Sequence, residues 1–214
     1  MVMTAPQRSG RHTPAGEQTV SQREQATAPA GHILPRTPRE LFESLPPTLC
    51  LRAEIIDGNL TVSPSGIPRH GRIAMRLAFA LLPVLEEHGW ESFVGNVDVC
   101  IEGPRDTVVP DYCLAPVDAP LWGDRELLSS ALILAAEVVS AGSMEMDRAT
   151  KPRIYANGGI PIMLIIDPIA SPPAVTVLSD PADGAYRTMT HVQMGKPILL
   201  PSPVDFDLDT SIFL

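Results

Sequence analysis

Leu132-Ile133-Leu134-Ala135-Ala136-Glu137-Val138-Val139 is an apolar run that contains a single charge, Glu137. A short continuous run of this kind predicts a strand that is buried on both faces of a sheet. A carboxylate inside such a strand must stay protonated or find a compensating cation, because an unpaired buried charge is costly. Two interpretations follow: a structural pair with an arginine such as Arg153, or a functional site that supplies a cation or metal ion.

A second apolar strand is predicted over Val108–Leu114, and it contains Pro110-Asp111. Proline removes a ladder donor, so this strand lies at a sheet edge or bends at Pro110. Alone, Asp111 is typical of a turn or cap. Together with Glu137 it could form a pair of converging carboxylates, and Mg²⁺ binds one or two carboxylates plus water and phosphate oxygens.

A helix is predicted over residues 147–157, and Asp147, Lys151 and Tyr155 follow one another at i, i+4 spacing on one face of it. The simplest interpretation is an Asp–Lys pair on the surface. The functional interpretation places the Lys151 ammonium over the two carboxylates, where it could stabilise charge on a phosphate. Pro152 is tolerated only in the first turn of a helix, so Lys151 should lie near the helix start.

The N-terminal half contributes two further candidates. A hairpin is predicted from Leu51–Asp57 to Asn59–Ser63 through Asp57-Gly58, and alternation places Arg52 and Glu54 on one face of it. Glu54 is either part of a cross-strand pair on a solvated face or a site residue. A long helix follows over residues 69–88, and His70 at its start is either a surface or capping residue or part of the site.

Composition narrows the function classes. The 214 residues include 16 Lys and Arg against 25 Asp and Glu, and the net charge of −9 argues against a general basic coat protein for nucleic acid. No apolar run approaches the length of a membrane span, and no signal segment is evident, so we expect a cytoplasmic protein without a membrane partner. We expect Cys50, Cys100 and Cys113 to be reduced thiols, a disordered tail over 1–30, and one domain over 36–214.

Several short motifs in this order resemble one known family. They are Pro110-Asp111, Glu137-Val138-Val139-Ser140, Asp147…Lys151…Tyr155, Gly159-Ile160-Pro161 and Ile166-Asp167-Pro168, preceded by Glu54-Ile55-Ile56-Asp57-Gly58 and His70. The set is similar to the Uma-type restriction endonucleases, which belong to the PD-(D/E)XK nuclease superfamily. The resemblance spans roughly residues 38–200.

The resemblance implies an α/β fold: a restriction-endonuclease-like mixed central sheet flanked by helices, with an antiparallel N-terminal hairpin and a C-terminal strand extension. It implies that Asp111 and Glu137 bind Mg²⁺ or Mn²⁺ and that Glu54 is a further acidic member of the site. Val139 stands where the superfamily usually has a lysine, so Lys151 would replace that lysine from the helix. The implied supporting residues are His70, Asp147 and Tyr155.

These inferences predict a Mg²⁺-dependent endonuclease that hydrolyses DNA phosphodiester bonds. The alternatives are a catalytically inactive module on the same fold, which binds nucleic acid or protein, and an acidic scaffold protein. A basic strip near the site would favour DNA binding, and its candidate members are Arg52, Arg69, Arg72, Arg76, Arg148 and Arg153. An exposed strand edge would be compatible with a homodimer.

Overall fold

The computed structural model describes residues 36–44, 52–63 and 66–214. The predicted tail over 1–30 and Cys50 lie outside these residues. The helices are α1 (Pro38–Ser44), α2 (Pro68–His88) and α3 (Lys151–Asn157), with 3-10 turns at Ser129–Ala131 and Thr210–Phe213 and a π-helical turn, η2, at Met146–Thr150.

Strands outnumber helices in the described residues. They are β1 (Arg52–Ile56), β2 (Asn59–Ser63), β3 (Trp90–Phe93), β4 (Val99–Cys100), β5 (Thr107–Val108), β6 (Tyr112–Pro116), β7 (Leu121–Trp122), β8 (Glu126–Leu128), β9 (Leu134–Val138), β10 (Ile162–Asp167), β11 (Ala174–Ala182), β12 (Ala185–Gln193), β13 (Pro197–Leu200) and β14 (Phe206–Asp209).

The central sheet has the strand order β12-β11-β10-β9-β6-β3. The apolar run around Glu137 forms β9, which pairs parallel with β10 and antiparallel with β6. All five residues of β9 are buried, as the sequence predicts for a strand covered on both faces. The sheet is therefore mixed, and β9 lies inside it.

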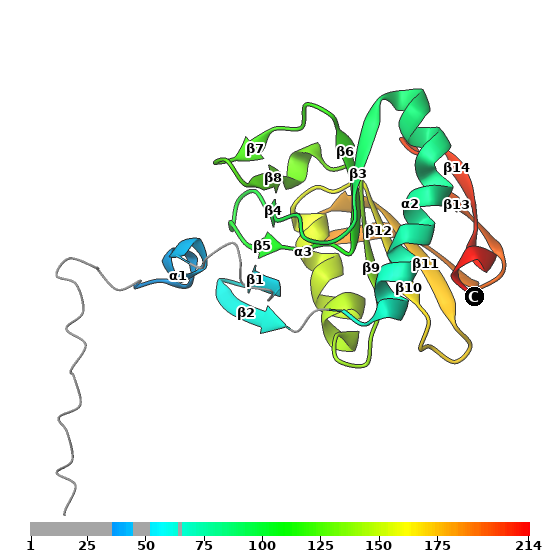
Figure 1. The fold of residues 1–214 in the computed structure, drawn as a ribbon, viewed down its shortest axis with the longest axis horizontal. Coiled ribbons are helices and arrows are strands. Elements are labelled where there is room, and N and C mark those ends of the chain that lie inside the picture. The colour runs from blue at the N-terminus through cyan, green and yellow to red at the C-terminus, as the bar shows by residue number, and fades with distance from the viewer. Residues whose placement is uncertain (1–35, 45–51, 64–65) are drawn as a thin grey trace, which may run out of the picture. The chain divides into compact units, whose positions relative to one another are not determined.

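Alternation along β9 decides which face each side chain reaches. Leu134, Ala136 and Val138 pack into a core shared with α2 and the C-terminal strands β13 and β14. Ala135 packs on the opposite face, in a second core with α3 and the other sheet. Glu137 has the same parity as Ala135, so it faces α3. In Figure 1, α2 and α3 lie on either side of the central sheet.

The second sheet has the order β2-β1-β5-β4-β8-β7. The expected hairpin is present as β1 and β2, and Asp57 and Gly58 both adopt positive φ in its turn, at 49° and 72°. Glycine adopts this conformation at no steric cost, and aspartate tolerates it. This sheet was not predicted as a separate unit, and neither were its short strands β7 and β8.

The predicted single strand over Val108–Leu114 is wrong in one respect. Its first part is β5, in the hairpin sheet, and its second part is β6, in the central sheet. The break falls at Pro110-Asp111, where proline cannot donate to a ladder. The chain therefore changes sheets at the residue pair that was expected to mark an edge or a bend.

The predicted long helix and the predicted C-terminal strands are both present in the structure. The long helix α2 starts with Pro68, and Gly89 caps its C-terminus in the left-handed conformation at φ 67°. The C-terminal extension is antiparallel: β11 and β12 extend the central sheet, and β13 pairs with β14. Cys100 and Cys113 are buried and free. Within the described ranges, no helix combines the length and apolar character needed to span a membrane.

Candidate active site

Asp111 and Glu137 come together because β6 and β9 are neighbours. Asp111 immediately precedes β6, and its backbone N–H donates to the carbonyl of Ala136 at 3.1 Å. Its side chain turns back across the strand, where Oδ2 accepts the N–H of Val138 at 2.8 Å. Asp111 is therefore fixed by the backbone on both sides of Glu137. The interpretation of Asp111 as only a turn or cap residue does not describe this position.

Glu54 reaches the same place from the hairpin. Its Oε1 accepts the N–H of Val109 at 2.8 Å, just before the break between β5 and β6. The residue is 5% exposed. The alternative of a cross-strand pair on a solvated face is therefore wrong, and three carboxylates meet where the two sheets join.

Lys151 and Tyr155 approach the carboxylates from α3. The π-helical turn η2 precedes α3, which begins at Lys151 and has Pro152 in its first turn, as expected. Lys151 Nζ lies 2.8 Å from Glu137 Oε1 and 3.2 Å from Glu54 Oε1. The Tyr155 hydroxyl also donates to Glu137 Oε1. A π-turn inside a helix is often found at functional sites.

Arg153 does not compensate Glu137. Its Nη2 lies 2.7 Å from Asp57 Oδ2, in an exposed ion pair at the hairpin turn. The alternative of a structural pair between Glu137 and Arg153 is therefore wrong, because Arg153, two residues after Lys151, lies on another face of α3 and pairs with Asp57. Lys151 takes that position instead.

Arg52 and His70 complete the group. Arg52 Nη1 lies 2.8 Å from Asp111 Oδ1, and its Nη2 lies 3.7 Å from Glu137 Oε2. His70 Nε2 lies 2.5 Å from Asp111 Oδ2. His70 reaches Asp111 from the first turn of α2, so it is neither a plain surface residue nor a helix cap.

Asp147 lies beside this group rather than on the surface. It is 3% exposed, and its Oδ2 has no hydrogen-bond partner among the described residues. The predicted surface pair between Asp147 and Lys151 is wrong, since both side chains are buried. Burial raises the pKa of Asp147, and the Lys151 charge opposes that effect only in part.

The charges in the site pull the carboxyl pKa values in opposite directions. Burial raises the pKa of Glu137 to about 8, although the Lys151 ammonium favours its ionised form. Burial also acts to raise the pKa of Asp111, but the bond from His70 and the charge of Arg52 outweigh it and lower that pKa. Acids whose environments separate their pKa values are typical of active sites.

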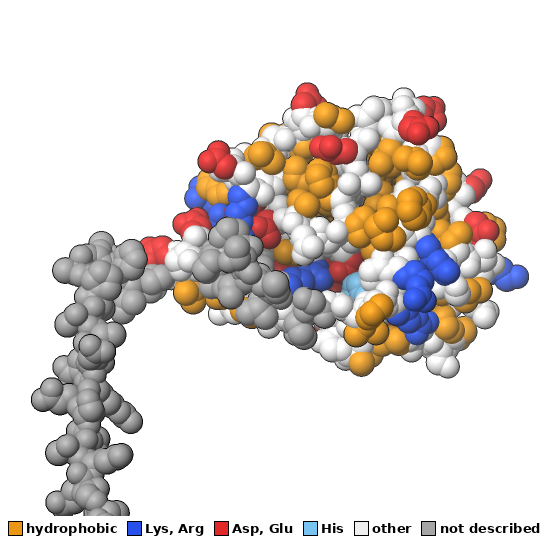
Figure 2. Space-filling view, viewed as in Figure 1, with side chains coloured by type: hydrophobic (Ala, Val, Ile, Leu, Met, Phe, Trp, Pro, Cys, Tyr) orange, Lys and Arg blue, Asp and Glu red, His pale blue; other side chains and the backbone are white. Residues whose placement is uncertain are grey.

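The group lies in a cleft with a volume of about 450 Å³. The hairpin, the start of α2 and the segment from Ser140 to Lys151 form its walls. The site residues that line it are Arg52, Glu54, His70, Asp111, Asp147 and Lys151. Figure 2 shows basic, acidic and histidine side chains gathered at one place on the visible face.

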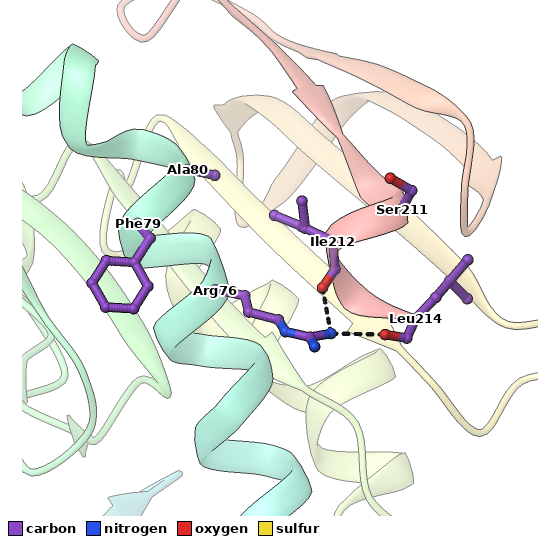
Figure 3. Close-up of a pocket in the computed structure, with 6 residues that line it drawn as sticks. All are labelled: Arg76, Phe79, Ala80, Ser211, Ile212 and Leu214. Carbon is purple, nitrogen blue, oxygen red and sulfur yellow. Dashed lines mark hydrogen bonds between the residues drawn. The ribbon is translucent and has the colours of Figure 1, made fainter.

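A second hollow, of about 510 Å³, lies between α2 and the C-terminal turn. Figure 3 shows Arg76 reaching from α2 to donate to the carbonyls of Ile212 and Leu214, both at 2.7 Å, with Phe79 nearby on the same helix. Apolar side chains and backbone carbonyls form this hollow. Among the described residues that line it, Arg76 has the only charged side chain, so we place the candidate active site in the smaller cleft.

The donor set of the cleft suits a hard cation. Carboxylate oxygens are the ligands Mg²⁺ takes, usually one or two of them together with water and substrate phosphate. Asp111 and Glu137 offer such oxygens from adjacent strands, and a cation would favour the ionised form of Glu137. A group of three or more His, Cys, Asp or Glu side chains already spaced for a metal ion is absent from the described part of the chain. The arginine Arg52 lies among the carboxylates instead.

The structure thus brings together all seven residues that the sequence singled out. Glu54 and Glu137 both contact Lys151. Asp111 is linked to the same two glutamates through Arg52. Sequence reasoning placed Arg52 on one face with Glu54 and in a basic strip, but it did not predict that Arg52 contacts the three carboxylates. The available signal was strand alternation, which puts Arg52 on the same face as Glu54.

The predicted basic strip is only partly formed. Arg69 and Arg72 are exposed at the start of α2, where Figure 2 shows Lys and Arg side chains gathered. Three other candidates make contacts within the chain, through the pairs Arg76–Ile212, Arg148–Asp167 and Arg153–Asp57, and Arg69 Nη2 donates to the carbonyl of Pro168 at 3.5 Å. Of the six candidates, Arg52 lines the cleft itself. Those without an acidic partner among the described residues are Arg69, Arg72 and Arg76, all on α2.

Comparisons with known proteins agree with this fold. The family model described as "Uma2: Putative restriction endonuclease" matches residues 39–211. A crystal structure described as "a putative nuclease belonging to DUF820" from Anabaena variabilis superposes with a TM-score of 0.64 at 17% sequence identity. That match covers 84% of this chain and 97% of the other. A comparison with curated proteins found no match.

Proposed function

The chain belongs to the Uma2 restriction-endonuclease family, and from this we propose that it is an endonuclease that hydrolyses DNA phosphodiester bonds with the help of Mg²⁺ or Mn²⁺. We assign the activity to one domain over residues 36–214. The observation that supports it most is that Glu54, Asp111 and Lys151 line an open cleft, where Lys151 also pairs with the buried Glu137. Structural proteins have little reason to bury three carboxylates beside a cavity, because desolvating them is costly.

In this proposal Asp111 and Glu137 hold the metal ion. When bound, such an ion lowers the pKa of a coordinated water and neutralises charge on the phosphate. Tyr155 fixes the Glu137 carboxylate through its hydrogen bond, and His70 fixes Asp111. Glu54 adds a third negative group.

Lys151 supplies a fixed positive charge beside the carboxylates. Its ammonium is held by Glu137 and Glu54, at 2.8 and 3.2 Å, so its position is fixed before substrate binds. A fixed positive charge stabilises negative charge that develops on a phosphate under attack, because no reorganisation is needed at that moment. Lys151 can therefore serve in place of the lysine that is missing at Val139.

A binding module without catalysis is the second candidate. The observation that favours it is the pairing of Arg148 and Arg153 with acidic residues, which leaves few free cations to hold a DNA backbone. Both candidates predict metal binding at the carboxylates. Only the first predicts cleavage.

A plasmid-nicking assay separates the two. Wild type should nick supercoiled DNA in Mg²⁺ or Mn²⁺ and not in EDTA, and Asp111→Asn and Glu137→Ala should each abolish nicking while circular dichroism shows a folded protein. The matched control is Asp183→Asn, which neutralises an exposed acid away from the cleft and should cleave normally.

Thermal melting of the same samples identifies the role of the metal. A ligand that binds the folded state raises the melting temperature. A rise with Mg²⁺ that Asp111→Asn loses, without nicking of any DNA or RNA substrate, would favour the binding module. Nicking by Glu137→Ala at the wild-type rate would refute the assignment of the site.

A further inference from the structure

The Arg52 guanidinium lies close to all three carboxylates. Its Nη1 is 2.8 Å from Asp111 Oδ1, its Nη2 is 3.7 Å from Glu137 Oε2, and its Nε is 3.6 Å from Glu54 Oε2. The side chain is only 24% exposed. One guanidinium thus faces three acids that come from three different strands or strand ends.

The three oxygens that face Arg52 are those that other groups leave free. Asp111 uses Oδ2 for the Val138 N–H and His70. Each glutamate uses its Oε1 for Lys151 and for one more donor, the Tyr155 hydroxyl or the Val109 N–H. The second oxygen of each of the three carboxylates therefore faces the Arg52 guanidinium.

Arg52 makes few hydrogen bonds at this point. Its Nε and Nη2 are buried and have no hydrogen-bond partner within the described ranges. An arginine in a structural carboxylate pair usually makes two parallel hydrogen bonds. Here the summed negative charge holds the guanidinium in place, and the geometry is that of a cation surrounded by oxygens rather than of a bidentate pair.

We propose that Arg52 is the resident cation of the metal-free site and that it competes with the divalent metal ion for the same three carboxylate oxygens. The proposal rests on the proposed function, since it concerns the same metal site. Arg52 stabilises the converging carboxylates when no metal is bound, and it must leave this position when a metal ion binds. Its location at the wall of the open cleft, on the hairpin, gives the side chain room to move out.

The first test compares wild type with Arg52→Met, which keeps the apolar stem and removes the charge. In EDTA, Arg52→Met should melt at a lower temperature than wild type. By calorimetric titration with Mn²⁺ alone it should bind about tenfold more tightly or better, a difference of about 1.4 kcal/mol in favour of the variant. The control is Arg187→Met, which removes an arginine from an exposed pair on β12 and should change neither quantity.

Equal or weaker Mn²⁺ binding by Arg52→Met overturns the competition, and it leaves the proposed nuclease intact if wild type still nicks DNA. Tighter binding without nicking by wild type supports the competition and counts against the nuclease. Absence of Mn²⁺ binding by both proteins overturns both ideas.

A second measurement follows Arg52 in the wild-type protein and uses a conservative variant only to assign its signal. The Nε–Hε signal of Arg52 in a ¹⁵N spectrum, assigned with Arg52→Lys, should be protected from exchange in EDTA. It should shift and exchange rapidly with water when Mg²⁺ is added. A signal that stays unchanged while Mg²⁺ binds, as seen by calorimetry, overturns the proposal.

Discussion

Replacing Lys151 by methionine tests whether the buried charges of the site depend on one another. Lys151 is 2% exposed and pairs with Glu137 at 2.8 Å and with Glu54 at 3.2 Å. Methionine preserves the unbranched stem, so the change removes the charge with little loss of packing. Two buried carboxylates would then have to share the remaining cation, Arg52.

The expected loss in free energy of unfolding depends on how well the remaining groups compensate Glu137 and Glu54. Removing one partner of a buried ion pair typically costs about 3–5 kcal/mol. Arg52 remains 3.7 Å from Glu137 and 3.6 Å from Glu54, and the Tyr155 hydroxyl still donates to Glu137, so we expect the lower end, about 3 kcal/mol. For a chain of this size that corresponds to a loss of about 6–12 °C in melting temperature.

Urea unfolding in EDTA at pH 9, above the raised pKa of Glu137 so that its carboxylate is ionised in the folded protein, measures this loss by circular dichroism. The control is Lys196→Met, which removes an exposed lysine and should lie within about 0.5 kcal/mol of wild type. Adding Glu137→Gln to Lys151→Met should restore at least about 1 kcal/mol, because residues in direct contact couple by this order.

Two results would refute the reasoning. Lys151→Met as stable as Lys196→Met would mean that the ammonium does not compensate the carboxylates. A double variant no more stable than Lys151→Met would mean that the loss comes from packing and not from an unpaired charge at Glu137.

Two further predictions concern Glu137. Its pKa is raised by burial from 4.5 to about 8, so the folded protein holds a proton that the unfolded chain releases, and metal-free stability should fall as pH rises through this window. Melting in EDTA between pH 5 and pH 9 should show this fall, and Glu137→Gln should flatten it; an unchanged slope in the variant would assign the fall to other groups. Tyr155→Phe removes a buried donor to Glu137 and should cost about 1–3 kcal/mol in urea unfolding, whereas a cost below about 0.5 kcal/mol would show that the hydrogen bond contributes little.

The sequence alone determined the elements that position the site. The apolar run around Glu137 predicted a buried strand, and Asp57-Gly58 predicted a tight turn. Pro152 placed Lys151 near the start of a helix. Each of these depends on local sterics, hydrogen bonding or hydrophobic periodicity, which neighbouring residues decide. The family resemblance rested on the same local motifs, and the family match agrees with it.

Tertiary structure decided which of these local features meet. The break at Pro110 was visible in the sequence, but the transfer of the chain from the hairpin sheet to the central sheet was not, because it depends on long-range strand pairing. That transfer brings Glu54 beside Asp111. The sequence also left the partner of Glu137 undecided. The packing of α3 places Lys151 beside Glu137 and Arg153 beside Asp57.

The position of Arg52 is the clearest example of a contact that the sequence could not predict. Alternation predicted that Arg52 and Glu54 share a face, but a face can be solvated or buried. The free oxygens of three carboxylates from separate parts of the chain converge on its guanidinium only in the folded protein. Charge compensation acts through space, so its partners are set by the fold and not by distance along the sequence.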